Sequence, residues 1–274
     1  MSGTGSSRAA RLQPLAVKVP QITLMFWVLK LLTTGIGEAT SDFLIHRNEP
    51  LAVLIGTSGF CLALWLQLRA RAYRAPLYWF AVLMVAVFGT MAADGAHVAA
   101  GLPYPVTTVL YALATAAAFV FWYRTEGTLS IHSIDTARRE MFYWTAVLAT
   151  FALGTAAGDL TALYLNLGFF VSIVLFASLI AIPAYGWMSS VFNPILAFWF
   201  AYVITRPLGA SIADWLGKSR SSTGLGLGDG VVSALGLLVF VALVAYVTVT
   251  SRDAETLSAP TPAAAPLRQP APPR

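Results

Sequence analysis

Four aspartates stand at equivalent positions of a repeated pattern in a chain that is otherwise very apolar. Each follows an aromatic–Trp pair and then a glycine, with nine residues between Trp and Gly and four between Gly and Asp. The aspartates are Asp42, Asp94, Asp159 and Asp214. An ionised aspartate at the centre of a bilayer costs roughly 2.5–3.5 kcal/mol, and acids in membrane helices usually serve ion or proton pathways. The pattern therefore predicts a ring of carboxylates that binds a cation or protons. The alternative is that each Asp reaches the outer interface and caps or hydrogen-bonds the next helix.

The tryptophans and glycines of the pattern each have a functional and a structural interpretation. Trp and Asp are fifteen residues apart, which is close to four helical turns, so they lie within about 60° of one helix face. The tryptophans form either an aromatic belt at the membrane interface or an aromatic gate: Trp27, Trp79, Trp144 and Trp199. The glycines predict close helix packing: Gly37, Gly89, Gly154 and Gly209.

The first repeat adds a second acid, Glu38, one turn before Asp42. Two carboxylates at this spacing share a helix face and repel each other. A bound cation or a shared proton would remove the repulsion. The alternative is that Glu38 pairs with Lys30 or Arg206, the two basic residues expected inside helices, which then act as internal counter-ions that compete with a bound cation.

His97 lies three residues after Asp94, on the same helix face. A carboxylate and an imidazole at this spacing could ligate a transition metal or pass a proton. The alternative is an ordinary hydrogen bond near the interface. The identity of any metal stays open, and no cofactor is expected.

The composition predicts an integral membrane protein. Of the 274 residues 58% are hydrophobic and 11% are charged, and the mean hydropathy is +0.73. A soluble domain carries roughly 25% charged residues. The net charge of +5 is better explained by basic cytoplasmic loops than by nucleic acid. Cys61 is the only cysteine, so an intramolecular disulfide is impossible.

Hydropathy predicts eight membrane helices in an all-α chain. We expect them near 21–45, 51–71, 77–101, 104–123, 141–164, 168–188, 191–216 and 227–250. Lys and Arg concentrate on the side that holds both termini, which predicts a multi-pass protein of the bacterial inner membrane with cytoplasmic ends. Residues 1–20 and the Pro/Ala-rich residues 251–274 are expected to be disordered.

The spacing predicts four tandem repeats of two helices each, at 21–76, 77–140, 141–190 and 191–250. An even number of helices per unit makes the repeats parallel, as four helical hairpins. The chain resembles uncharacterised bacterial membrane proteins built from four such repeats, each with a characteristic tryptophan. The basic junctions "RAYRAPLYW" and "ARREMFYW" also resemble that family. The resemblance implies the architecture and brings no established activity.

These observations favour a transporter of a metal ion or organic cation, coupled to protons. Its partners are the bilayer and a small cation or proton, and its oligomeric state stays open. The rival interpretation is a membrane scaffold or sensor whose aspartates are structural. An enzyme is not expected, since the chain has no Gly-x-Ser-x-Gly, His-Glu-x-x-His or phosphate-loop motif.

Overall fold

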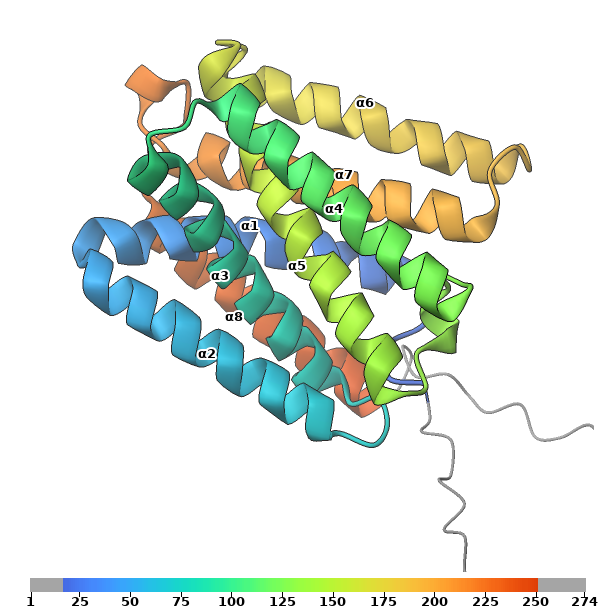
Figure 1. Cartoon of the computed structure of the whole chain (residues 1–274). Coiled ribbons are helices and arrows are strands. Elements are labelled where there is room, and N and C mark those ends of the chain that lie inside the picture. The colour runs from blue at the N-terminus through green and yellow to red at the C-terminus, as the bar shows by residue number, and fades with distance from the viewer. Residues whose placement is uncertain (1–16, 251–274) are drawn as a thin grey trace, which may run out of the picture.

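The computed structural model describes residues 17–250, and within them it contains helices and loops but no strand (Figure 1). The long helices are α1 (Leu24–Arg47), α2 (Glu49–Arg69), α3 (Ala75–Ala100), α4 (Tyr104–Glu126), α5 (Ala137–Asp159), α6 (Gly168–Met188), α7 (Pro194–Gly217) and α8 (Asp229–Thr250). A π-helical turn, Leu160–Tyr164, extends α5. The eight expected helices are therefore present, with ends shifted by a few residues. The tails expected to be disordered lie outside the described residues, apart from 17–20.

Seven of these helices, α2 to α8, are long and apolar enough to cross a membrane. This marks the chain as a multi-pass membrane protein. The exception, α1, carries Lys30, Glu38 and Asp42 along its length.

The helices form two layers. The inner layer is a ring in which α1 contacts α3 and α7, and α5 contacts the same two helices. Within their most apolar windows α3, α5 and α7 are 61–67% buried, whereas the outer helices α2, α4, α6 and α8 are 17–22% buried. The outer helices therefore present most of their apolar surface outward, as expected for contact with lipid.

Each outer helix packs mainly on the inner helix that follows it in the ring. Helix α2 packs on α3, α4 on α5, α6 on α7, and α8 returns to pack on α1. The expected arrangement of four helical hairpins is therefore confirmed only in part, because α3 and α4 are consecutive but touch little. The repeat in sequence pairs an odd helix with the next even one, whereas packing pairs an even helix with the next odd one.

The repeat glycines form the contacts between neighbouring inner helices. A Cβ added to Gly37 would lie 2.3 Å from the Cβ of Ala86 on α3. The other contacts follow the ring in the same direction: Gly89 to Phe151, Gly154 to Arg206, and Gly209 to Thr34. Every residue that receives a glycine stands three positions before the glycine of its own repeat. The ring thus has approximate fourfold order, and the predicted packing role of the glycines is confirmed.

Candidate functional site

Equivalent residues of the four inner helices face one another and form layers that follow one another along the helix axes. Side chains four residues apart lie on one helix face. In each repeat, the aromatic residue before Trp and the aspartate are sixteen positions apart, so both lie on one face with three further residues between them at intervals of four. In the first repeat these residues are Phe26, Lys30, Thr34, Glu38 and Asp42. The candidate site is formed by contacts between residues at these equivalent positions of the four repeats.

An aromatic layer closes one end of the ring. Each aromatic residue that precedes a repeat tryptophan packs against the tryptophan of the next repeat, with ring centroids 5.7–6.1 Å apart. The pairs are Phe26–Trp79, Tyr78–Trp144, Tyr143–Trp199 and Phe198–Trp27. Trp79, Trp144 and Trp199 are buried, and Trp27 is partly buried. Three of the four tryptophans thus lie inside the protein rather than in an outer belt, and their action as a gate stays a hypothesis.

The hydroxyls of Tyr78 and Tyr143 meet within this layer, 2.5 Å apart. The indole nitrogen of Trp199 donates to the carbonyl oxygen of Leu129, 2.9 Å away. The layer is therefore held by polar contacts as well as by ring packing.

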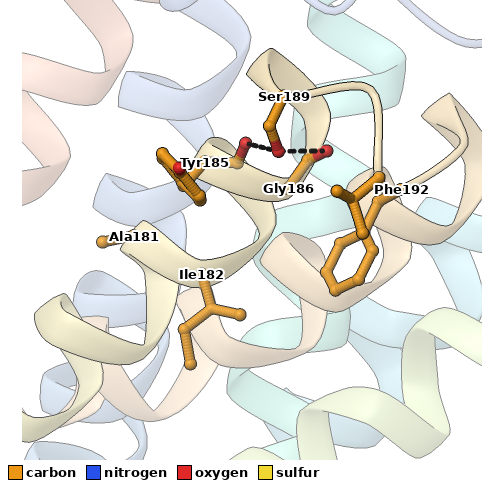
Figure 2. Close-up of a pocket in the computed structure, with 7 residues that line it drawn as sticks. Ala181, Ile182, Tyr185, Gly186, Ser189 and Phe192 are labelled. Atoms are coloured by element: carbon orange, nitrogen blue, oxygen red, sulfur yellow. Dashed lines mark hydrogen bonds between the residues drawn. The ribbon is translucent and has the colours of Figure 1, made fainter.

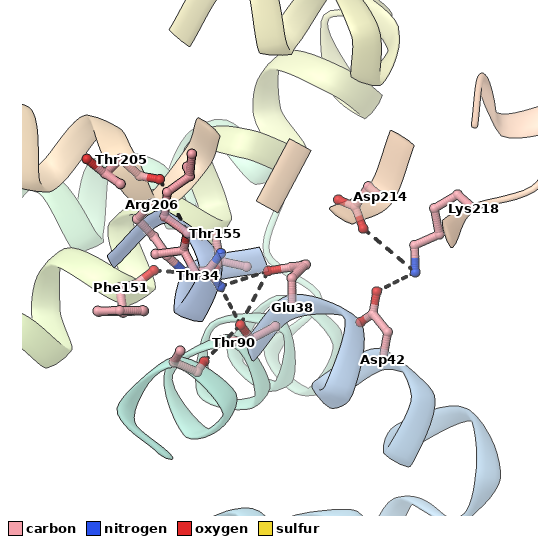
Figure 3. A network of polar contacts seen from close by, with 12 residues as sticks. Thr34, Glu38, Asp42, Thr90, Phe151, Thr155, Thr205, Arg206, Asp214 and Lys218 are labelled. Carbon is pink, nitrogen blue, oxygen red and sulfur yellow. Dashed lines mark hydrogen bonds and ion pairs between the residues drawn. The ribbon is translucent and has the colours of Figure 1, made fainter. Parts of the chain in front are cut away.

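Arg206 lies at the middle of the ring and reaches the other three inner helices (Figure 3). Its Nη2 is 2.7 Å from Glu38 Oε2 on α1 and 2.7 Å from Thr155 Oγ1 on α5, and it also contacts Thr90 Oγ1 on α3. Arg206 is fully buried and Glu38 is 4% exposed. The prediction that Glu38 pairs with Lys30 or Arg206 is therefore confirmed for Arg206.

Lys30 is buried without an ion pair. Its Nζ lies 4.0 Å from the ring centre of Phe151 and 4.1 Å from that of Tyr202. Among the described residues Nζ has no hydrogen-bond acceptor. Cation–π contacts are therefore the attractive interactions that the surroundings offer this ammonium.

The repeat aspartates gather with Glu38 at the end of the ring opposite the aromatic layer. One oxygen each from Glu38, Asp42 and Asp94 lies within 4.8 Å of the others, close enough to hold one metal ion. Asp159 and Asp214 interact electrostatically with Glu38 and Asp42. Asp214 is buried, and Asp42, Asp94 and Asp159 are partly buried. We call these five acids together with Asp229, described next, the acid cluster.

Lys218, just beyond the end of α7, contacts three carboxylates of the acid cluster. Its Nζ contacts Asp42 and lies 3.3 Å from Asp229 Oδ2 and 4.0 Å from Asp214 Oδ1. Burial lowers the pKa of Lys218, but Asp42, Asp214 and Asp229 outweigh it and hold the pKa above its ordinary value. Lys218 and Asp229 are not among the site residues that the sequence predicted. The one available signal was the four-residue spacing of Lys218 from Asp214, which puts both on one helix face.

Asp94 and Asp159 differ from the other acids of the cluster. Within residues 17–250 no hydrogen bond or ion pair joins either carboxylate. Six carboxylates thus share two contacting cations, Arg206 and Lys218. The cluster has an excess of acid and could accept a further cation or protons.

His97 is occupied elsewhere. Its Nδ1 contacts the carbonyl oxygen of Leu102, and its ring stacks on Tyr104 with 4.0 Å between centroids. His97 is not one of the residues whose ligand atoms come within metal-binding distance of one another. The oxygen atoms of Glu38, Asp42 and Asp94 remain, and these suit a hard cation such as Mg²⁺, Ca²⁺ or Mn²⁺.

Two apolar hollows lie outside the ring. One, near the end of α6, has a volume of about 390 Å³ and is lined by residues such as Ile182, Tyr185 and Phe192 (Figure 2). The other, of about 820 Å³, lies between the end of α4 and the start of α7. Neither is lined by a charged side chain, so neither is a candidate cation site.

The fold and the site together define a multi-pass helical membrane protein with an internal repeat and a buried cluster of acids. The chain belongs to the family described as a Repeat of Unknown Function (DUF347), whose model matches residues 77–128, 142–191 and 197–253. The family match thus covers three tandem repeats, where four were expected. Residues 21–76 lie outside it, although they carry the same aromatic–Trp, Gly and Asp spacing. No protein of curated function and no solved structure matches the chain.

Proposed function

We propose that this protein transports a cation across the membrane and exchanges it for protons at the acid cluster. The observation that carries the proposal is the excess of carboxylates over contacting cations, with Asp94 and Asp159 unpaired within residues 17–250. Carboxylates this close repel when all are ionised. A bound cation removes the repulsion, and in its absence protons do, so the two compete for one site.

The oxygen ligands favour a hard metal ion as the cargo. Glu38, Asp42 and Asp94 offer three carboxylate oxygens within 4.8 Å of one another, and all-oxygen sites suit Mg²⁺, Ca²⁺ or Mn²⁺. An organic cation is the alternative cargo. Lys218 and Arg206 act as internal counter-ions that the cargo displaces in part.

The proposed orientation puts the acid cluster in the outer half of the bilayer and the aromatic layer toward the cytoplasm. In this arrangement α1 crosses the membrane as an eighth span within the inner ring. Its 24 residues extend about 36 Å at 1.5 Å per residue, enough for a hydrocarbon core of about 30 Å. Both termini are then cytoplasmic, in the bacterial inner membrane.

The test measures cation binding by a variant that lacks the unpaired acids. The probe is Mn²⁺, titrated calorimetrically into purified protein and followed as uptake in proteoliposomes. For Asp94→Asn/Asp159→Asn we expect Mn²⁺ affinity to fall at least about 100-fold. One carboxylate at 4 Å contributes roughly 4 kcal/mol at an effective dielectric of 20, and about 1.4 kcal/mol is a factor of ten. Glu49→Gln, an exposed acid at the adjacent start of α2, is the matched control and should bind as the wild type does.

The rival function is a membrane scaffold or sensor whose acids are structural. It is favoured by the ion pairs that Arg206 and Lys218 already make. It predicts unchanged Mn²⁺ binding and uptake in a folded Asp94→Asn/Asp159→Asn variant. Titration of tetramethylammonium in parallel separates an organic cargo from a metal ion.

A further inference from the structure

A buried oxygen site lies at the end of the ring opposite the acid cluster, and the side chain of Lys18 occupies it. Lys18 precedes α1 and is only 2% exposed. Its Nζ is 2.6 Å from Glu140 Oε2 and 3.3 Å from the carbonyl oxygen of Leu68 on α2. Glu140, in the first turn of α5, is 1% exposed. The ammonium is thus buried and contacts one oxygen from each of two helices.

Gln67 contacts the carboxylate of this site and leaves one acceptor unused. Its Nε2 donates to Glu140 Oε1 over 3.1 Å, which fixes the carboxylate from the other side. Its Oε1 is buried and has no hydrogen-bond donor among the described residues. A buried acceptor without a donor is costly. A metal ion coordinates several oxygens at once, so it could use this oxygen together with Glu140 and the Leu68 carbonyl.

The site lies next to the aromatic layer. Glu140 is three residues before Tyr143, whose ring belongs to that layer and whose hydroxyl meets that of Tyr78. Glu38 and the acid cluster lie on the other side of the same layer. Acids on each side of the aromatic layer are therefore paired with cations of the chain itself: Lys218 with Asp42, Arg206 with Glu38, and Lys18 with Glu140.

We propose that Glu140, the Leu68 carbonyl and Gln67 Oε1 form a second cation site and that Lys18 is its tethered occupant. The inference rests on the proposed transport function, since a cation that crosses the ring leaves through this end. The cation displaces the Lys18 ammonium, takes up the three oxygens, and releases the segment before α1. Lys18 returns when the cation departs.

The decisive experiment counts Mn²⁺ sites by calorimetry in purified full-length protein. Lys18→Met removes the competing ammonium and should bind the same number of Mn²⁺ ions as the wild type, with several-fold higher affinity at this site. Lys18→Met/Glu140→Gln is the matched control, since it has the same missing ammonium but no carboxylate, and it should bind one Mn²⁺ ion fewer than the wild type and Lys18→Met. Equal site numbers in the two variants would overturn the second site. Failure of the proposed function has a different signature, because it leaves Mn²⁺ binding unaffected by Asp94→Asn/Asp159→Asn.

A second measurement uses the wild-type protein and does not depend on the stability of a variant. The amine of Lys18 is acylated in proteoliposomes with a water-soluble succinimidyl ester, and its modification is followed by peptide mass spectrometry. Displacement by the cation predicts a several-fold faster reaction at Lys18 with saturating Mn²⁺. The reaction at the α-amino group of each sample serves as the internal reference. An unchanged rate at Lys18 would mean that the cation does not displace it.

Discussion

Arg206 of α7 and Glu38 of α1 form an ion pair in the middle of the inner ring, with 2.7 Å between Nη2 and Oε2, although they are 168 positions apart in sequence. The same Nη2 contacts Thr90 and Thr155, so one guanidinium joins all four inner helices. Arg206 breaks the fourfold order of the ring, because the equivalent positions of the other three repeats hold Thr34, Ala86 and Phe151.

Removing one partner of this pair should destabilise the protein strongly. Arg206→Met leaves Glu38 as an uncompensated buried acid, which costs about 3–5 kcal/mol. Arg206→Met/Glu38→Gln removes both charges and should recover much of that loss. Thermal unfolding in detergent, followed by tryptophan fluorescence, measures the difference. A double variant no more stable than Arg206→Met would contradict a pairwise origin of the loss.

Replacing each of the two buried lysines, Lys18 and Lys30, by Met should change the stability of the protein in opposite directions. Lys30 has no acceptor, and desolvating an unpaired ammonium costs several kcal/mol, more than the roughly 2 kcal/mol of a desolvated cation–π contact. Lys30→Met should therefore raise stability by about 1–2 kcal/mol. Lys18→Met breaks the pair with Glu140 and should lower stability by about 3–5 kcal/mol. Equal effects in the same unfolding assay would show that pairing does not distinguish these lysines.

The close packing of the ring should be sensitive to a single methyl group. In Gly37→Ala the new Cβ would lie 2.3 Å from the Cβ and 2.9 Å from the backbone carbonyl carbon of Ala86, so α1 and α3 must separate. We expect a loss of about 1–3 kcal/mol, as for overpacked cores. Gly95→Ala is the matched control: Gly95 is also helical, and no atom lies within 4 Å of its added Cβ. It should be neutral or gain up to about 1 kcal/mol, and destabilisation by both variants would argue against the clash.

Lys218 should make the protein sensitive to alkaline pH. Its pKa is raised on folding by Asp42, Asp214 and Asp229, against the effect of burial. The stabilisation is therefore full below the ordinary pKa of 10.5 and is lost as the pH rises through the higher pKa of the folded state. Unfolding temperatures measured from pH 8 to 12 should show a steeper alkaline decline in the wild type than in Lys218→Gln. If the unfolding temperatures of the two proteins fall in parallel, Lys218 is not the cause of the alkaline sensitivity.

The repeated spacing was sufficient to predict the inner face of the ring. A period of aromatic, Trp, Gly and Asp is encoded locally, and helical geometry converts it into side chains on one face. The repeat period predicted the close contacts at the repeat glycines, and hydropathy predicted the eight helices. The sequence also restricted the partner of Glu38 to two residues, of which Arg206 is the one in contact.

Other features could not be read from the sequence, because they depend on contacts between distant segments. Glu140 and Lys18 are separated by 122 residues, and no local pattern connects them. Lys18 lies within residues 1–20, for which the sequence predicted disorder. The packing of outer helices on the following inner helices was also missed, because α2, α4, α6 and α8 are apolar on all sides and carry no stripe that identifies a partner.

The return of α8 to α1 has a consequence for biosynthesis. Helix α1 is synthesised before the other helices and carries Lys30, Glu38 and Asp42. It is the one long helix among residues 17–250 that is too polar to count as an independent span. The outer helix that packs on it is the last of these to leave the ribosome, and Arg206 follows Glu38 by 168 residues. At 5–20 residues per second this delay is about 10–30 s. During that interval the insertion machinery, rather than the protein's own fold, must shelter α1 from lipid, and a nascent chain arrested before α8 should remain a substrate for membrane quality-control proteases.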